Sequence, residues 1–142
     1  ESDEFHAYYV NGSGVNSNPV ISATGQFLTQ TSGSGERIGH MKISPDGTKL
    51  AIANFASGVV ELFDFDAETG IVSNPLVLTP GIVSQFPYGI AFSADSKKFY
   101  YGRKASNGAA PWVFINLTLT TLTRIASWIV KLSLRTLIPK RK

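Results

Sequence analysis

Apolar and polar residues alternate in short runs along most of this chain, which is the pattern of half-buried β-strands. Segments rich in glycine, serine and asparagine separate the runs, and these residues favour tight turns. The sequence therefore predicts short antiparallel strands over its first hundred residues. The expected strands are 5–11, 19–23, 37–44, 48–54, 58–66, 75–79, 88–93 and 97–103.

One strand–turn–strand unit occurs twice, at 38–53 and at 87–102, with a spacing of 49 residues. A second match, at a spacing of 56, relates 14–21 to 70–77. Short strands that repeat every 40–50 residues or so are typical of β-propeller blades. The polar residues of the first match correspond as Ser44, Asp46 and Lys49 to Ser93, Asp95 and Lys98.

The segment Ser44-Pro45-Asp46-Gly47 has the composition of a hairpin turn. Proline pre-sets φ at the second turn position, and glycine suits the fourth. In the second copy alanine and serine replace this proline and glycine, so that turn is encoded less strongly. We assign a structural turn role to six residues: Ser44, Pro45, Asp46, Gly47, Ser93 and Asp95.

The predicted fold class is all-β, an incomplete β-propeller with about two blades of four-stranded antiparallel sheet. Residues 37–79 form one full blade, a half blade lies on each side of it, and the partial propeller covers residues 1–104. The first residues already have a strand pattern, which suggests that the chain is cut at its N-terminus. Two blades do not close a ring, so we expect exposed sheet faces and self-association.

Residues 105–142 form an atypical basic tail. Residues 96–142 contain ten of the thirteen bases and none of the ten acids. Helical and strand periodicities conflict over residues 117–137, and we favour a helix there. Two explanations stay open: a reading-frame or assembly error replaced the original sequence, or the basic extension is native.

Three segments together carry a resemblance to known proteins: residues 41–51, 60–66 and 87–93. They resemble propeller repeats, of the YVTN type, in large secreted bacterial surface proteins, which often carry a type IX sorting domain. They are similar, more loosely, to the lactonase-type seven-bladed propeller family. Residues 69–75, Thr-Gly-Ile-Val-Ser-Asn-Pro, point to the surface-protein group. The resemblance implies a secreted or cell-surface location in a bacterium.

Candidate chemistry is sparse. The chain has no cysteine, so it has no disulfide, thiolate metal site or thiol nucleophile. Acids at alternate positions from Asp64 resemble the start of a calcium loop, but Pro75 stands where an EF-hand requires glutamate, and we favour a polar turn. His6 and His40, the two histidines, have no predicted carboxylate or second ligand near them. Serines 13, 32 and 34 lie in glycine-rich loops without a nucleophile motif.

We therefore predict no catalytic residue, no metal ligand and no cofactor. The expected function is a non-enzymatic scaffold or binding module; the alternative is a fragment of a lactonase-like hydrolase, so enzyme status stays open. Expected partners are the remaining blades of a longer chain and a protein or glycan ligand of unknown identity. We expect no nucleic-acid partner, because no recognition motif accompanies the basic tail. We also do not expect the tail to associate with a membrane.

Overall fold

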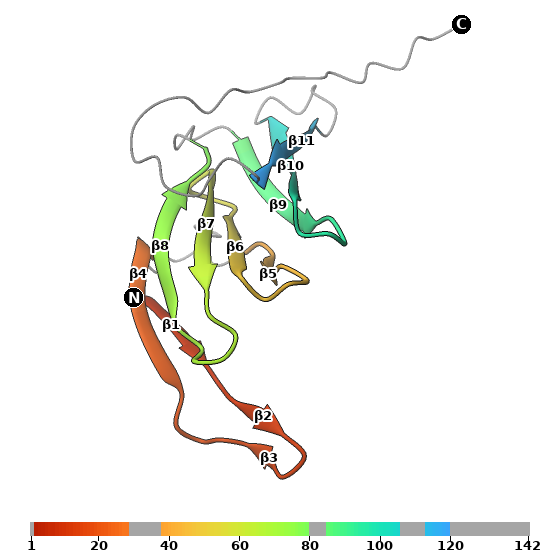
Figure 1. Ribbon diagram of the computed structural model, residues 1–142. Helices are drawn as coiled ribbons and strands as arrows, with labels where there is room; N and C mark the ends of the chain where they lie inside the picture. Colours follow the sequence, from red (N-terminus) through yellow and green to blue (C-terminus); the bar gives the residue numbers. More distant parts are fainter. Residues whose placement is uncertain (1, 29–37, 80–84, 106–112, 120–142) are drawn as a thin grey trace, which may run out of the picture.

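Figure 1 shows the computed structural model, which describes residues 2–28, 38–79, 85–105 and 113–119. Every regular element in these ranges is a β-strand, so the predicted all-β class is confirmed. The first sheet pairs β1 (Ser2–Ala7) with β4 (Val20–Leu28) in antiparallel orientation. Between them in sequence, β2 (Val10–Asn11) and β3 (Gly14–Val15) form a small hairpin at the protruding tip.

The central sheet is a four-stranded antiparallel meander. Its strands follow chain order: β5 (Met41–Ile43), β6 (Lys49–Asn54), β7 (Val59–Phe65) and β8 (Val72–Val77). Although β5 is shorter than the predicted strand at 37–44, the ladder continues beyond it. The backbone N–H of Ala53 donates to the His40 carbonyl at 2.9 Å, and that of Phe55 donates to the Ile38 carbonyl at 3.0 Å.

The fourth strand of the central sheet begins at Val72 rather than at the predicted residue 75. The strand continues through a backbone irregularity at Asn74. Asn74 has φ +51°, and the pairing of β7 with β8 shifts register between Leu62 and Asp64. Asparagine tolerates a left-handed backbone better than most residues, and its side-chain amide donates to Asp64 at 2.8 Å. The Ser-Asn-Pro segment therefore lies inside a bulged strand instead of preceding a strand.

The third sheet has the order β11–β10–β9 and contains β9 (Gln85–Phe92), β10 (Lys98–Ala105) and β11 (Val113–Thr118). Its first hairpin repeats the register of the central sheet: Ile90 lies opposite Tyr101, as Met41 lies opposite Ile52, 49 residues earlier. The sheet continues through β11, beyond the predicted boundary at residue 104. The helix that we favoured over residues 117–137 is wrong at its start, because Leu117 and Thr118 end β11. Residues 120–137 lie outside the described residues.

One face of the central sheet packs against the third sheet. The central sheet contributes small or medium side chains, and the third sheet contributes larger ones. The buried cluster contains Ala51, Ala53, Val60 and Leu62 from the central sheet and Ile90, Phe99, Tyr101 and Ile115 from the third. Successive side chains of a strand point to opposite faces, so the residues between these positions face the other way.

The opposite face of the central sheet packs against the first sheet. Leu50, Phe63 and Val72 form a second buried cluster, and the rings of Phe5 and Phe63 meet edge to face with centroids 4.9 Å apart. Gly25 of β4, with φ +87°, lies directly over Phe63, because a Cβ built there would be 2.8 Å from the ring. At β6 and β7 the central sheet is thus buried on both faces, as a blade inside a propeller is.

Truncating Phe99 tests whether the two stacked sheets form one cooperative core. The Phe99 side chain has 0% exposure, so Phe99→Ala should lower the free energy of unfolding by about 3–5 kcal/mol. Urea denaturation followed by circular dichroism measures this loss. Val10→Ala, at a side chain that is 65% exposed, is the matched control and should change stability by less than about 0.5 kcal/mol. Equal effects of the two substitutions would contradict the packing.

Candidate functional site

The predicted turn residues lie in two matching hairpin turns, one between β5 and β6 and one between β9 and β10. The Ser44 hydroxyl donates to Asp46 Oδ1 at 2.6 Å and accepts the backbone N–H of Lys49 at 2.9 Å. In the second turn Ser93 makes the same two bonds, at 2.6 and 2.9 Å. The serine and the aspartate of each copy therefore close a turn.

The two turns also contact each other. Gly47 has φ +71°, and the corresponding Ser96 has φ +57°, which is an uncommon conformation for a residue other than glycine. The Ser96 hydroxyl accepts the backbone N–H of Asp46 at 3.1 Å, and Ser96 is buried. The unusual backbone of the second turn thus accompanies a hydrogen bond from the first turn.

The turn carboxylates are held in their charged form. The hydrogen bond from Ser44 is the main cause that lowers the pKa of Asp46, and the one from Ser93 lowers the pKa of Asp95. Charged carboxylates accept hydrogen bonds more strongly than neutral ones do. Pro45 is exposed at the corner of the first turn. All of these contacts serve the turns themselves.

The acidic segment that begins at Asp64 is also occupied by the protein's own groups. The Lys49 ammonium pairs with one Asp64 oxygen, and the Asn74 amide donates to the other at 2.8 Å. Asp66 accepts the Thr69 hydroxyl at 2.8 Å. These contacts agree with a polar turn after β7, the interpretation that the sequence favours.

The two histidines lie in different places. The backbone N–H of His40 donates to the Tyr88 carbonyl at 3.1 Å, and the two rings lie 5.2 Å apart at the seam between the central and third sheets. His6 Nε2 lies 3.2 Å from Glu4 Oε2 on β1, and both side chains are exposed. Within the described ranges, no three histidine or acidic side chains are grouped so that they could hold a metal ion.

Among the described residues, the candidate serines form no nucleophile site. Ser13 lies at the tip of the β2–β3 hairpin, where its backbone N–H donates to the Asn11 side chain at 2.8 Å. Serines 32 and 34 lie outside the described residues. In the part of the chain that the structure describes, no helix has the length and hydropathy needed to cross a membrane.

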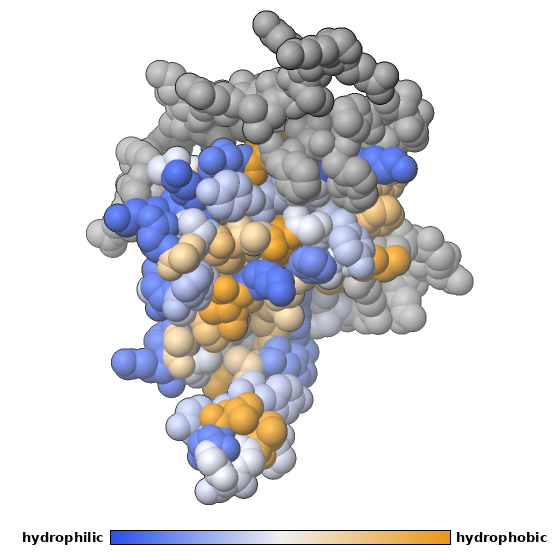
Figure 2. Space-filling model, turned by 90° about the vertical axis from the view of Figure 1, so that its right-hand side faces the viewer, coloured by the Kyte–Doolittle hydropathy of each residue, from blue (hydrophilic) through white to orange (hydrophobic). Residues whose placement is uncertain are grey.

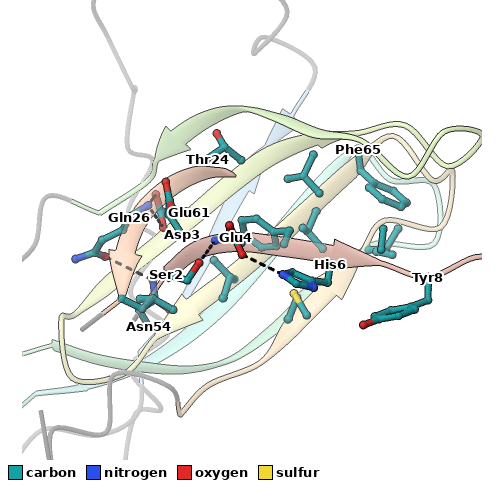
Figure 3. Close-up of a pocket in the computed structure, with 18 residues that line it drawn as sticks. Ser2, Asp3, Glu4, His6, Tyr8, Thr24, Gln26, Asn54, Glu61 and Phe65 are labelled. Atoms are coloured by element: carbon teal, nitrogen blue, oxygen red, sulfur yellow. Dashed lines mark hydrogen bonds and ion pairs between the residues drawn. The ribbon is translucent and has the colours of Figure 1, made fainter. Parts of the chain in front are cut away.

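A cleft of about 420 Å³ lies between the first and central sheets (Figure 3). Strand β1 forms one wall along its whole length, and β5 and β6 form much of the other wall. Most of the wall is apolar, so the cleft favours a partner that brings apolar surface. Its main apolar residues are Phe5, Met41, Ile43, Leu50, Ile52 and Phe65.

One end of the cleft is polar. Glu61 is 3% exposed, and its two oxygens lie 3.1 and 3.3 Å from the backbone nitrogen of Gln26, which donates to both. The Asn54 amide donates to the Gln26 side chain at 3.5 Å. Figure 3 shows these three residues together at one end and Phe65 and Tyr8 at the other. Burial raises the pKa of Glu61, because desolvation penalises its charged form.

This polar end was missed in the sequence analysis, although a signal for it exists. Glu61 interrupts the apolar run of β7, and buried glutamates are rare unless they are paired. It lies opposite Ile52, whereas Ile115 takes the corresponding place opposite Tyr101 in the third sheet. The exception within the repeat marks the site. Gln26 and Asn54 carry no comparable signal, because their role depends on the packing of two sheets.

Neither known protein families nor curated protein sequences contain a match to this chain. Among solved structures, the crystal structure of a protein from Lactobacillus plantarum, a structural-genomics target, is similar to it. The TM-score is 0.50 and the identity 21%, over 82% of this chain and 32% of that one. That protein is propeller-like. This chain is an incomplete β-propeller. It spans about a third of the other protein's length, and the likeness shows the fold alone.

Removing the Ser44 hydroxyl tests the role of the turn. Ser44→Ala loses the bonds to Asp46 and from Lys49, so the free energy of unfolding should fall by about 1–2 kcal/mol. Urea denaturation measures the change. Ser13→Ala is the control, because no hydrogen bond of the described residues uses that hydroxyl. A loss no larger than that of the control would show that the turn does not depend on Ser44.

Neutralising Glu61 tests its burial through pH. The folded state raises the pKa of Glu61 above its ordinary value of 4.5, so folding favours the protonated form. Stability should then fall as the pH rises through and beyond that value, and Glu61→Gln should lack this loss. We expect the variant to gain stability relative to the wild type as the pH rises above 4.5. Denaturation curves recorded below and above this pH measure the change, and Glu68→Gln, at an exposed glutamate, is the control. The same pH dependence of stability in both variants would contradict the burial of Glu61.

Proposed function

We propose that this chain is a non-enzymatic part of a β-propeller in a secreted or cell-surface bacterial protein, where it serves as a scaffold or binding module. The main support is how the repeated polar residues are used. Ser44 and Asp46 bond to each other and to their own turn, and Ser93 and Asp95 do the same. The polar residues that the two copies share therefore stabilise the turns of the fold.

The apolar surfaces support the same proposal. The central sheet packs on both faces through buried clusters, whereas the chain also exposes large apolar side chains elsewhere. Figure 2, which views the side of the molecule that carries β5 and β9, shows hydrophobic surface on the body and on the β2–β3 tip. Such surface suits further blades and a protein or glycan ligand. The secreted location rests on the resemblance of residues 41–51, 60–66 and 87–93 to surface-protein repeats.

One observation favours the alternative of a lactonase-like hydrolase. The cleft holds a buried carboxylate, Glu61, with a raised pKa, and groups of this kind occur at catalytic sites. In such an enzyme the reacting groups would come from several blades around a channel. Here the Glu61 carboxylate is bonded by the Gln26 backbone, and His6 pairs with Glu4 rather than with it.

Sequencing outward from the coding region and assaying the full-length product separates the two functions. We expect further blades and a C-terminal sorting domain, and no hydrolysis of lactones by the purified full-length protein. A stand-alone propeller with histidine, glutamate and arginine facing its channel, and with lactone hydrolysis that Glu61→Gln abolishes, would replace this proposal with the hydrolase. The same sequence shows whether residues 105–142 are native.

A further inference from the structure

Corresponding positions of the two repeat copies differ sharply in exposure. Met41 of β5 is 56% exposed, and its counterpart Ile90 of β9 is 5% exposed. Ile43 is likewise 50% exposed, whereas its counterpart Phe92 packs against the core. The register and the turn bonds of the two hairpins are the same, so their surroundings cause the difference.

The covered hairpin, β9–β10, shows which neighbour the exposed hairpin, β5–β6, lacks. Ile90 and Phe99 of the third sheet pack with Ala51 and Ala53 of β6. Strands β5 and β6 form the first hairpin of the central sheet, residues 38–54, which we call its inner hairpin. The first sheet would have to supply such an inner hairpin to cover Met41 and Ile43. It consists of β1 and β4 alone among the described residues. The cleft lies at the place of this hairpin, beside β5 and β6.

Among the described residues, strand β1 is paired along one edge only. In the central sheet the corresponding strand β7 is bonded on both sides, to β6 and to β8. Strand β1 is bonded to β4 on one side, and the structure describes no strand on its other side. A row of backbone N–H and C=O groups on such an edge accepts an added strand. The cleft thus combines a backbone edge with an apolar wall.

We propose that this cleft binds a β-hairpin of the propeller repeat type, supplied by another propeller segment rather than by a second folded copy of this chain. The second strand of the hairpin pairs with β1, as β6 pairs with β7. Its small side chains pack on Met41, Ile43 and Ile52, as Ala51 and Ala53 pack on the third sheet. The inference deepens the proposed scaffold and binding role by naming the surface and its partner.

A synthetic peptide of residues 38–54, the inner hairpin of the central sheet, is a suitable probe. Fluorescence anisotropy of the labelled peptide, titrated with the 142-residue chain, should show saturable binding. In the proposed pose Ala51 and Ala53 face the cleft, and Leu50 and Ile52 face away from it. A peptide with Ala51→Glu and Ala53→Glu should therefore bind about tenfold more weakly or worse, because each change places a charge against apolar surface.

A second peptide separates this pose from general adhesion of apolar peptides. Leu50→Thr together with Ile52→Thr makes the peptide less apolar but leaves the proposed contact face intact. This peptide should keep its affinity within about threefold, since its changed side chains point away from the cleft. Non-specific adhesion predicts the reverse order of the two modified peptides, and that order would overturn the inference.

Variants of the chain locate the bound peptide. Ile43→Asp places a charge on the cleft wall and should weaken binding about tenfold or more. Val10→Asp, on the exposed β2–β3 tip, is the matched control and should bind as the wild type does. Circular dichroism of both variants checks that they fold. Equal binding by two folded variants would overturn the inference.

Self-association is measured on the same samples. If the chain forms dimers that Ile43→Asp dissociates, and the peptide does not compete with them, a second copy occupies the cleft and the inference is wrong. Failure of the peptide to bind a folded monomer also overturns it. Neither result affects the proposed scaffold role, because that role is tested by the full-length gene and its product.

Discussion

The structure depends on one constraint: the central sheet has to bury both of its faces. Strands β6 and β7 place alternate side chains on opposite sides, so a run such as Leu50-Ala51-Ile52-Ala53 supplies two different surfaces at once. One surface is small and the other large. Each surface is buried against a neighbouring sheet, as the two hydrophobic clusters show.

Size complementarity explains how those neighbours fit. Alanines on the central sheet leave room for Phe99 and Tyr101 of the third sheet, which are almost fully buried. On the other face Gly25 leaves room for the ring of Phe63. Interiors are packed at crystal-like density, so a large side chain on one sheet needs a small one opposite. At both interfaces a small residue of one sheet thus lies opposite a large side chain of the next sheet along the chain.

Much of the fold could be predicted from the sequence, because strand register and turn chemistry are local. The hairpin at 87–102 has the register of the hairpin at 38–53, as the spacing of 49 residues predicts. The start of β8 was misplaced, since the positive φ of Asn74 is set by a bulge against β7. The two-residue strands of the β2–β3 tip are too short to show a period. The cleft was not predictable, because its walls belong to two sheets far apart in sequence.

Glu61 has a consequence for the assembly of the propeller. Its counterpart in the third sheet is Ile115, which packs against the alanines of the central sheet. If the two sheets exchanged places, Glu61 would no longer lie against the first sheet, and its buried carboxylate would lose the backbone N–H of Gln26 that donates to it. Two neighbouring sheets whose first hairpins share a register are therefore not interchangeable. A single ionisable side chain, that of Glu61, therefore favours one order of the sheets and disfavours the exchanged order.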